Sequence, residues 1–197
     1  MDAGEKGMRS YLPDQLLARR AAAGHLEDFE ELLRRYRDRV YRICYRMAGN
    51  AEDAQDWTQE CFVRVYRQLH HYDSGLPFAP WLLRVASNTC VNLAKSRAHH
   101  QSKLGMSYEE DHEMPSSIGD PLRSALSGEE ARQVQAAVAA LPPMLKQAVV
   151  LRVVEGLSFR ELAETLGIPL QTAASRVRRA LLQVREQLEQ VESEVEQ

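Results

Sequence analysis

The chain has 197 residues and a formal net charge of −3, with 27% charged and 44% hydrophobic residues. These values fit one or two globular domains, and 10 glycines and 8 prolines are too few for a β-rich or disordered chain. No run of about 18 apolar residues occurs, and the first residues hold no apolar segment. The sequence therefore predicts no membrane insertion and a cytoplasmic location.

The cysteines and histidines predict neither a metal site nor a cofactor. The three cysteines are odd in number, widely spaced and without a C-x-x-C pair, which argues against disulfides or a zinc ribbon. We interpret them as packing residues of apolar helices rather than redox groups. Two adjacent histidine pairs lie near predicted loops and lack partners at helical spacing. The cysteines are Cys44, Cys61 and Cys90.

The first half of the chain predicts four helices after a loose terminus at residues 1–12. A short helix over 14–23 precedes one over 29–47, in which apolar residues recur at positions i, i+3, i+4 and i+7. Asn50 caps a third helix. After a loop that contains Gly and Pro, a fourth helix is expected over 78–94.

The second half follows a polar, partly acidic segment at 98–126, which reads as a flexible linker. A capping box of Ser127 and Glu130 begins a helix, Pro142-Pro143 break it, and another helix is expected over 145–155. We therefore predict an all-α protein of two small helical domains. They comprise residues 13–97 and 127–190, with an acidic tail at 191–197.

Residues 158–184 predict a helix-turn-helix. Ser158 and Glu161 form a capping box, and Gly167 supplies the left-handed residue that ends the first helix. One apolar stripe on each helix is expected to face inward. The stripes are Phe159, Leu162, Ala163 and Leu166 on the first helix, and Leu170, Ala173, Val177, Leu181 and Val184 on the second.

The outer face of the second helix carries hydroxyl and guanidinium groups, which suit the DNA major groove. Residues 170–185 contain four arginines and no acid, whereas 186–197 contain five glutamates and no base. Because salt confines electric fields to about a Debye length, this basic face can bind phosphates on a mildly acidic protein. A solvated helix surface is the alternative. The candidate DNA contacts are Thr172, Ser175, Arg176, Arg178 and Arg179.

The order of the segments resembles an extracytoplasmic-function (ECF) sigma factor of the sigma-70 family, the two-domain kind. DFEELLRRYRDRVYRICYRMAGNAEDAQDWTQECFVRVYRQL is similar to its polymerase-binding segment, and FAPWLLRVASNTCVNLAKSR to its promoter-melting segment. LPPMLKQAVVLRVVEGLSFRELAETLGIPLQTAASRVRRALLQVREQL is similar to its upstream-element domain. A helix-turn-helix alone is a weak signal, but separate segments in the family's order are specific.

This resemblance implies core RNA polymerase as a partner, through the coiled coil of its β′ subunit and through its β subunit. Within AEDAQDWTQECF, four residues correspond to the motif that meets the coiled coil. Carboxylates beside an apolar stripe suit docking onto a basic helical surface. A solvated helix face is again the alternative. The four residues are Asp53, Asp56, Gln59 and Glu60.

The resemblance also implies promoter DNA as a partner. Asn88 corresponds to the position beside the base flipped out of the −10 element, and the loop at 71–80 to the segment that forms its pocket. An Asn amide offers a donor and an acceptor to an exposed base edge, although a helix-surface amide is the alternative. The residues expected to steady the DNA backbone are Arg84, Asn92, Lys95 and Arg97.

The five candidates on the second helix of the helix-turn-helix correspond to readers of the −35 element. Ala173 and Ala174 depart from the family's usual residues, so the −35 sequence stays open. An anti-sigma partner that covers both domains is a further implication. A DNA-binding regulator with a helical sensor domain remains the competing hypothesis. An enzyme is not expected, because the sequence has no Gly-rich phosphate loop, metal-ligand cluster or nucleophile–base pair.

Overall fold

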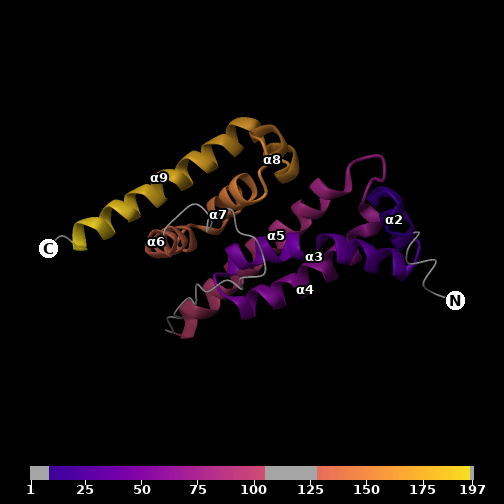
Figure 1. Cartoon of the computed structure of the whole chain (residues 1–197), viewed down its shortest axis with the longest axis horizontal. Coiled ribbons are helices and arrows are strands. Elements are labelled where there is room, and N and C mark those ends of the chain that lie inside the picture. Colours follow the sequence, from indigo (N-terminus) through magenta and orange to yellow (C-terminus); the bar gives the residue numbers. More distant parts are fainter. Residues whose placement is uncertain (1–8, 105–127, 196–197) are drawn as a thin grey trace.

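The computed structural model describes residues 9–104 and 128–195, and every regular element in these ranges is a helix (Figure 1). This confirms the predicted all-α class. None of the helices in the described ranges is long and apolar enough to cross a membrane. The elements are α2 (Asp14–Ala22), α3 (Leu26–Ala48), α4 (Ala51–Gln68), a 3-10 turn (Leu69–His71), α5 (Phe78–Leu104), α6 (Gly128–Ala139), α7 (Pro143–Val149), a π-helical segment (Val150–Val154), α8 (Phe159–Leu166) and α9 (Leu170–Val195).

Three of the predicted start and stop signals are confirmed. The Asn50 side chain accepts a hydrogen bond from the Asp53 backbone N–H at 2.8 Å and so caps α4. Ser158 and Glu161 form both hydrogen bonds of the capping box at α8. Gly167 ends α8 with φ +65°, a left-handed conformation that costs a residue with a Cβ more than it costs glycine.

Two predicted boundaries of the first half were wrong. Helix α5 continues to Leu104, so residues 98–104 of the expected linker are helical; they contain neither Gly nor Pro to stop the helix. Residues 105–126 and the Ser127 cap lie outside the described residues. At the other end, the Arg35 guanidinium donates hydrogen bonds to the carbonyls of residues 9, 10 and 12. That part of the expected loose terminus is therefore tied to α3.

The second half also departs from expectation at its helix ends. Helix α7 begins at Pro143 rather than Leu145, because proline fits the first turn of a helix. It passes into the π-helical segment, where the Glu155 N–H reaches the Val150 carbonyl at 3.3 Å. Helix α9 runs to Val195, so the expected tail begins as helix.

The inward stripes of the helix-turn-helix were only partly predicted. Leu170 and Leu181 are each 51% exposed, and Phe159 is 40% exposed beneath the Arg152 guanidinium. The prediction omitted Ala180, which is part of the buried stripe of α9. Neighbouring helices approach closely at this position, and a small side chain fits there. The buried residues of α9 are Ala173, Val177, Ala180 and Val184.

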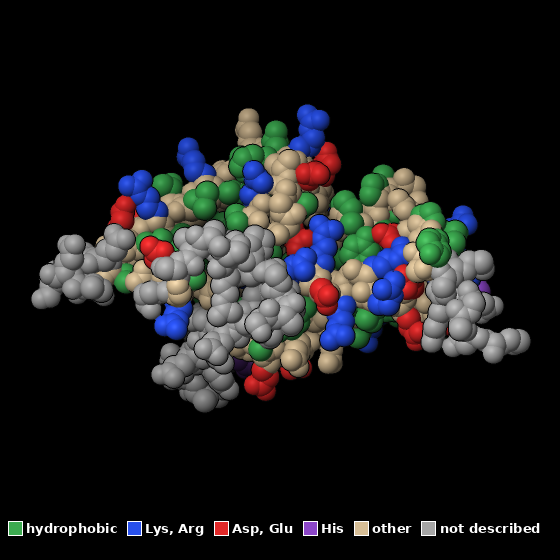
Figure 2. All heavy atoms as spheres, viewed as in Figure 1, with side chains coloured by type: hydrophobic (Ala, Val, Ile, Leu, Met, Phe, Trp, Pro, Cys, Tyr) green, Lys and Arg blue, Asp and Glu red, His purple; other side chains and the backbone are tan. Residues whose placement is uncertain are grey.

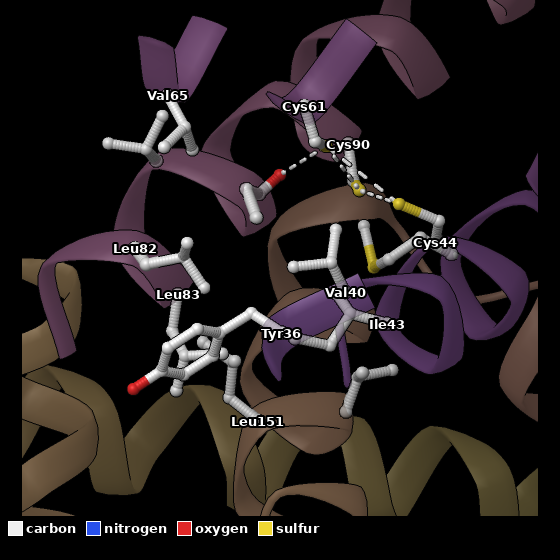
Figure 3. Packing of buried hydrophobic residues seen from close by; sticks show 14 of the residues in the cluster. Tyr36, Val40, Ile43, Cys44, Cys61, Val65, Leu82, Leu83, Cys90 and Leu151 are labelled. Atoms are coloured by element: carbon white, nitrogen blue, oxygen red, sulfur yellow. Dashed lines mark hydrogen bonds between the residues drawn. The ribbon is translucent and has the colours of Figure 1, made fainter. Parts of the chain in front are cut away.

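The main hydrophobic core joins both halves of the chain. Buried residues of α3, α4 and α5 form one cluster with Leu162, Ala163 and Leu166 of α8. Leu151 of the π-helical segment is fully buried and belongs to the same cluster as Tyr36 and Ile43 of α3 (Figure 3). Burial of this kind contributes roughly 25 cal/mol per Å² of apolar surface. The second half thus packs onto the first through its own core residues.

Candidate promoter and polymerase interfaces

The helix-turn-helix is held together by backbone hydrogen bonds around a tight turn. The Ile168 N–H bonds the Ala163 carbonyl at 3.0 Å, and the Thr172 N–H bonds the Pro169 carbonyl at 2.9 Å. These contacts set α9 across the end of α8, and basic side chains, all of them arginines in these two helices, project along the edge that the helices form (Figure 2). Arg178 and Arg179 are exposed on α9. Their guanidinium groups are therefore available to duplex DNA.

The other three −35 candidates are less open. Thr172, Ser175 and Arg176 are each half-buried, and the Ser175 hydroxyl donates to the Thr172 carbonyl at 3.2 Å. A hydroxyl that donates to its own helix keeps only its acceptor lone pairs for another partner.

Three of the four −10 candidates line one polar pocket of about 310 Å³. Arg84, Asn88 and Asn92 occupy successive turns of α5 along it, whereas Lys95 is exposed on the same helix but does not line it. The pocket also includes Arg64 and Gln68 of α4 and Trp81 of α5.

Sequence reasoning missed those three pocket residues. Arg64 and Gln68 are four residues apart and so share one face of α4, which was the available signal. The sequence does not show that this face of α4 lies against α5, because that depends on how the helices pack in the folded protein. Trp81 was assigned to the core stripe, but its side chain is only half-buried.

The second half of the chain contacts this pocket. The Gln147 side-chain amide of α7 is 2% exposed and donates to the Asn88 side-chain oxygen at 2.9 Å and to the Ser87 hydroxyl at 3.1 Å. The turn of the helix-turn-helix lies close by, because a Cβ placed on Gly167 would come within 2.8 Å of an Arg84 guanidinium nitrogen. Asn88 itself remains exposed.

An ion pair reinforces the contact between the halves. The Arg39 guanidinium of α3 pairs with the Glu155 carboxylate, whose side chain is 2% exposed. A buried carboxylate without a cation carries a large desolvation penalty, so this pair couples the position of the π-helical segment to α3.

The four polymerase candidates divide into two kinds. Asp56 and Gln59 are exposed. Asp53, in contrast, forms an ion pair with Arg97 at 2.8 Å, and Glu60 forms one with Arg64 at 2.8 Å. These intramolecular pairs orient two of the carboxylates on α4.

Beside these residues α3 and α4 form an open apolar groove of about 460 Å³. Gln59 lines it, and the large apolar side chains Leu26, Val63 and Tyr66 in its wall are between 39% and 56% exposed. Exposed apolar surface of this extent commonly marks a protein interface. The polar candidate Gln59 therefore lies in the wall of this apolar groove.

Comparison with known proteins decides the family. Residues 32–100 match Sigma-70 region 2, and residues 131–184 match Sigma-70, region 4. The ECF RNA polymerase sigma factor SigE of Mycolicibacterium smegmatis is 36% identical over 173 residues, 87% of this chain and 66% of that protein. The ECF RNA polymerase sigma factor SigW of Bacillus subtilis is 31% identical over 170 residues, 84% of this chain and 91% of that protein. The chain belongs to the ECF sigma factors.

A solved structure confirms the fold of this sigma factor. The sigma factor RpoE of Bartonella quintana, in complex with the anti-sigma factor NepR, aligns with a TM-score of 0.64 at 20% identity, over 83% of this chain and 98% of that chain. The polymerase and −10 candidates all fall within the region 2 match, and the −35 candidates within the region 4 match. Sigma factors are initiation factors that bind core RNA polymerase and promoter DNA and are not enzymes, so the predicted function is confirmed and the sensor-regulator hypothesis is set aside.

Proposed function

We propose that this sigma factor divides promoter recognition between the pocket on α5 and the exposed arginines of α9. The observation that carries the proposal is the polar pocket lined by Arg84, Asn88 and Asn92. A flipped base needs a polar recess with donors and acceptors and a ring to stack on. The half-buried Trp81 indole supplies that ring in the same pocket.

The −35 element is assigned to α9. Exposed Arg178 and Arg179 provide guanidinium forks for guanine edges or phosphates. Thr172, Ser175 and Arg176 lie at the half-buried margin of the same face and favour backbone contacts. Lys95, outside the pocket on α5, is assigned to phosphates near the −10 element.

The polymerase surface is assigned to α4 and the adjoining groove. Exposed Asp56 and Gln59 would meet the β′ coiled coil first, while Asp53 and Glu60 act from their ion pairs with Arg97 and Arg64. The apolar groove supplies the hydrophobic surface that an interface buries at its centre, and the polar residues of α4 form the rim. Region 4 would meet the β subunit, and the protein would act in the cytoplasm with the polymerase.

The contact between the halves must open for this function. The Gln147 amide occupies one of the two lone pairs of the Asn88 side-chain oxygen, so a base gains the full hydrogen-bonding capacity of Asn88 only after α7 moves away. An anti-sigma factor that binds both halves would hold this closed arrangement, and the sigma factor RpoE of Bartonella quintana was solved in complex with the anti-sigma factor NepR. The domains at 13–97 and 127–190 are then the two bodies that separate on polymerase.

Run-off transcription with core RNA polymerase on a promoter library tests the assignments. Arg179→Ala should weaken promoter binding by about 1–3 kcal/mol if it reads a base, or lower the salt slope by about 0.9 if it binds a phosphate. Arg185→Ala is the matched control, because Arg185 is exposed further along α9 and pairs with Glu189. Equal loss in both variants would contradict the −35 assignment.

The other two surfaces need their own readouts. Asn88→Ala should abolish open-complex formation while polymerase binding persists, which permanganate footprinting and gel filtration measure separately. Asp56→Ala and Gln59→Ala should reduce co-elution with core polymerase, whereas Glu30→Ala removes an exposed carboxylate from α3 and should not. Normal co-elution of both α4 variants would remove the polymerase assignment.

A further inference from the structure

The three cysteines of the chain converge at one point of the core. Their sulfur atoms lie 3.8 Å (Cys44 to Cys61), 3.6 Å (Cys44 to Cys90) and 3.9 Å (Cys61 to Cys90) apart, and all three residues are fully buried (Figure 3). They come from α3, α4 and α5, respectively. Their wide spacing along the chain gave no sign of this convergence.

The sulfur triangle has the size of a trithiolate site. A point equidistant from three sulfurs at these separations lies about 2.2 Å from each, close to the roughly 2.3 Å of a metal–thiolate bond. An ion slightly out of the plane lengthens those bonds to the usual value. No movement of the helices is needed to bring the three ligands together, because the sulfurs are already in contact.

The apolar environment of the three sulfurs determines which ionic charge is favoured at this site. Three thiolates carry a charge of −3, so a monovalent ion leaves −2, a divalent ion −1 and a trivalent ion none. The cysteines belong to a large cluster of buried apolar side chains, and the polar groups at the thiols are uncharged: the Ala86 carbonyl, 3.5 Å from the Cys61 sulfur, and the Thr58 hydroxyl beside Cys44. An unpaired charge in such a core is costly, so a neutral complex is favoured over a charged one.

We propose that the thiols of Cys44, Cys61 and Cys90 form a binding site for a trivalent ion that prefers sulfur ligands, namely arsenic(III). Arsenous acid, As(OH)3, is small and uncharged, so it can enter during local opening of the core. Each thiol displaces one hydroxide as water, so three S–H and three As–OH bonds are replaced by three As–S bonds and three waters. The oxidation state of arsenic does not change.

The three thiols differ in the direction of their pKa shifts. Hydrogen bonds from the Cys61 and Cys90 thiols lower the pKa of Cys44, so its sulfur has the greatest thiolate character. The hydrogen bond with Cys44, together with burial, raises the pKa of Cys61 and that of Cys90.

Binding would crosslink α3, α4 and α5, the helices on which the polymerase and −10 candidates lie or against which they pack. Cys61 lies on α4 one residue beyond the polymerase candidate Glu60, and Cys90 on α5 two residues beyond Asn88. The inference is independent of the proposed contacts, because it concerns only the core. Failure of arsenic binding would leave the promoter and polymerase assignments untouched.

The test uses the full chain, reduced and without other thiols, titrated with arsenite. Because the chain has only three cysteines, loss of all free thiols at one arsenic per protein reports this site alone. Intact-mass measurement should show one arsenic gained and three protons lost, and X-ray absorption should show three sulfur neighbours. Two sulfurs per arsenic, or thiols that react only in denaturant, would overturn the proposal.

Thermal melting separates a folded site from capture by the unfolded chain. A ligand that prefers the folded state raises the melting temperature, and one that prefers the unfolded state lowers it. Arsenite should raise it, and zinc, which would leave a net charge, should raise it less. A lowered melting temperature, or a larger rise with zinc than with arsenite, would contradict the assignment.

Single replacements complete the test. Cys90→Ala and Cys61→Ala should each abolish both the one-to-one thiol loss and the rise in melting temperature, while arsenite-free circular dichroism shows whether each variant folds. If a variant does not fold, the mass and melting results on the unaltered chain still decide. Unchanged arsenic stabilisation in a folded Cys90→Ala variant would refute the three-thiol site.

Discussion

The region 2 half and the region 4 half of this sigma factor build their cores differently. The first half buries large aliphatic and aromatic side chains between α3, α4 and α5, with Phe78 packed edge-on against Tyr36 and Tyr72. The second half has a small cluster of its own, which comprises Ala137, Leu141, Val149, Ala180 and Val184. Eight other buried apolar residues of the second half belong to the core of the first half: Ala148, Val150, Leu151, Leu162, Ala163, Leu166, Ala173 and Val177. The DNA-reading helix-turn-helix therefore depends on region 2 for much of its burial in this closed arrangement.

The largest expected effect comes from the shared core. Leu82→Ala removes a fully buried side chain of α5 and should destabilise the protein by about 2–5 kcal/mol. Because the cluster spans both halves, urea unfolding followed by circular dichroism should shift as one transition. Leu141→Ala, in the small cluster, is the matched comparison and should shift the same transition by a smaller amount, because fewer side chains pack around it. If Leu82→Ala instead showed a second unfolding transition at an unchanged urea concentration, region 4 would fold without support from region 2.

The ion pair between the halves should matter less than the core but more than a surface pair. Arg39→Ala leaves the Glu155 carboxylate buried without its cation and should cost about 1–3 kcal/mol, measured by a double-mutant cycle with Glu155→Ala. Arg185→Ala breaks an exposed pair with Glu189 and should cost at most about 0.5 kcal/mol. Equal costs for the two pairs would show that the halves are not held together in solution.

The turn of the helix-turn-helix sharpens the same comparison. Gly167→Ala places a Cβ in the left-handed region and should cost about 1–2 kcal/mol. The new methyl group also approaches Arg84, so limited proteolysis should show looser docking of region 4. Gly156→Ala is the control, since it has a similar positive φ but meets no atom within 4 Å. Identical proteolysis of the two variants would contradict the close approach to Arg84.

The smallest effect concerns the cap of α8. Ser158→Ala removes a side-chain acceptor and should cost about 1 kcal/mol. The Ser158 hydrogen bonds also lower the pKa of Glu161. This contribution is present above the ordinary pKa of a glutamate and is lost as the pH falls through the lowered value in the folded state. Melting curves of Glu161→Gln and the unaltered chain should therefore converge toward acid pH, and a constant difference would exclude the ionised cap.

Local rules determined much of this protein from its sequence. The caps at Asn50 and Ser158 and the stop at Gly167 depend on residues within a few positions of one another, and all were predicted correctly. The segment order that identifies the family is also a property of the chain alone. Errors occurred where a local signal was weak, as at 98–104, where polarity suggested a linker but no residue breaks the helix.

Only the tertiary structure decided which distant residues meet. Gln147 reaches Asn88 across 59 positions, and Cys44 meets Cys90 across 46. The pocket on α5 likewise required Arg64 and Gln68 from α4. Helical periodicity specifies which face of a helix is apolar, but it does not specify which helix covers that face or at what register. That choice is made by the packing of side chains from all helices at once, since their shapes must fill a common core.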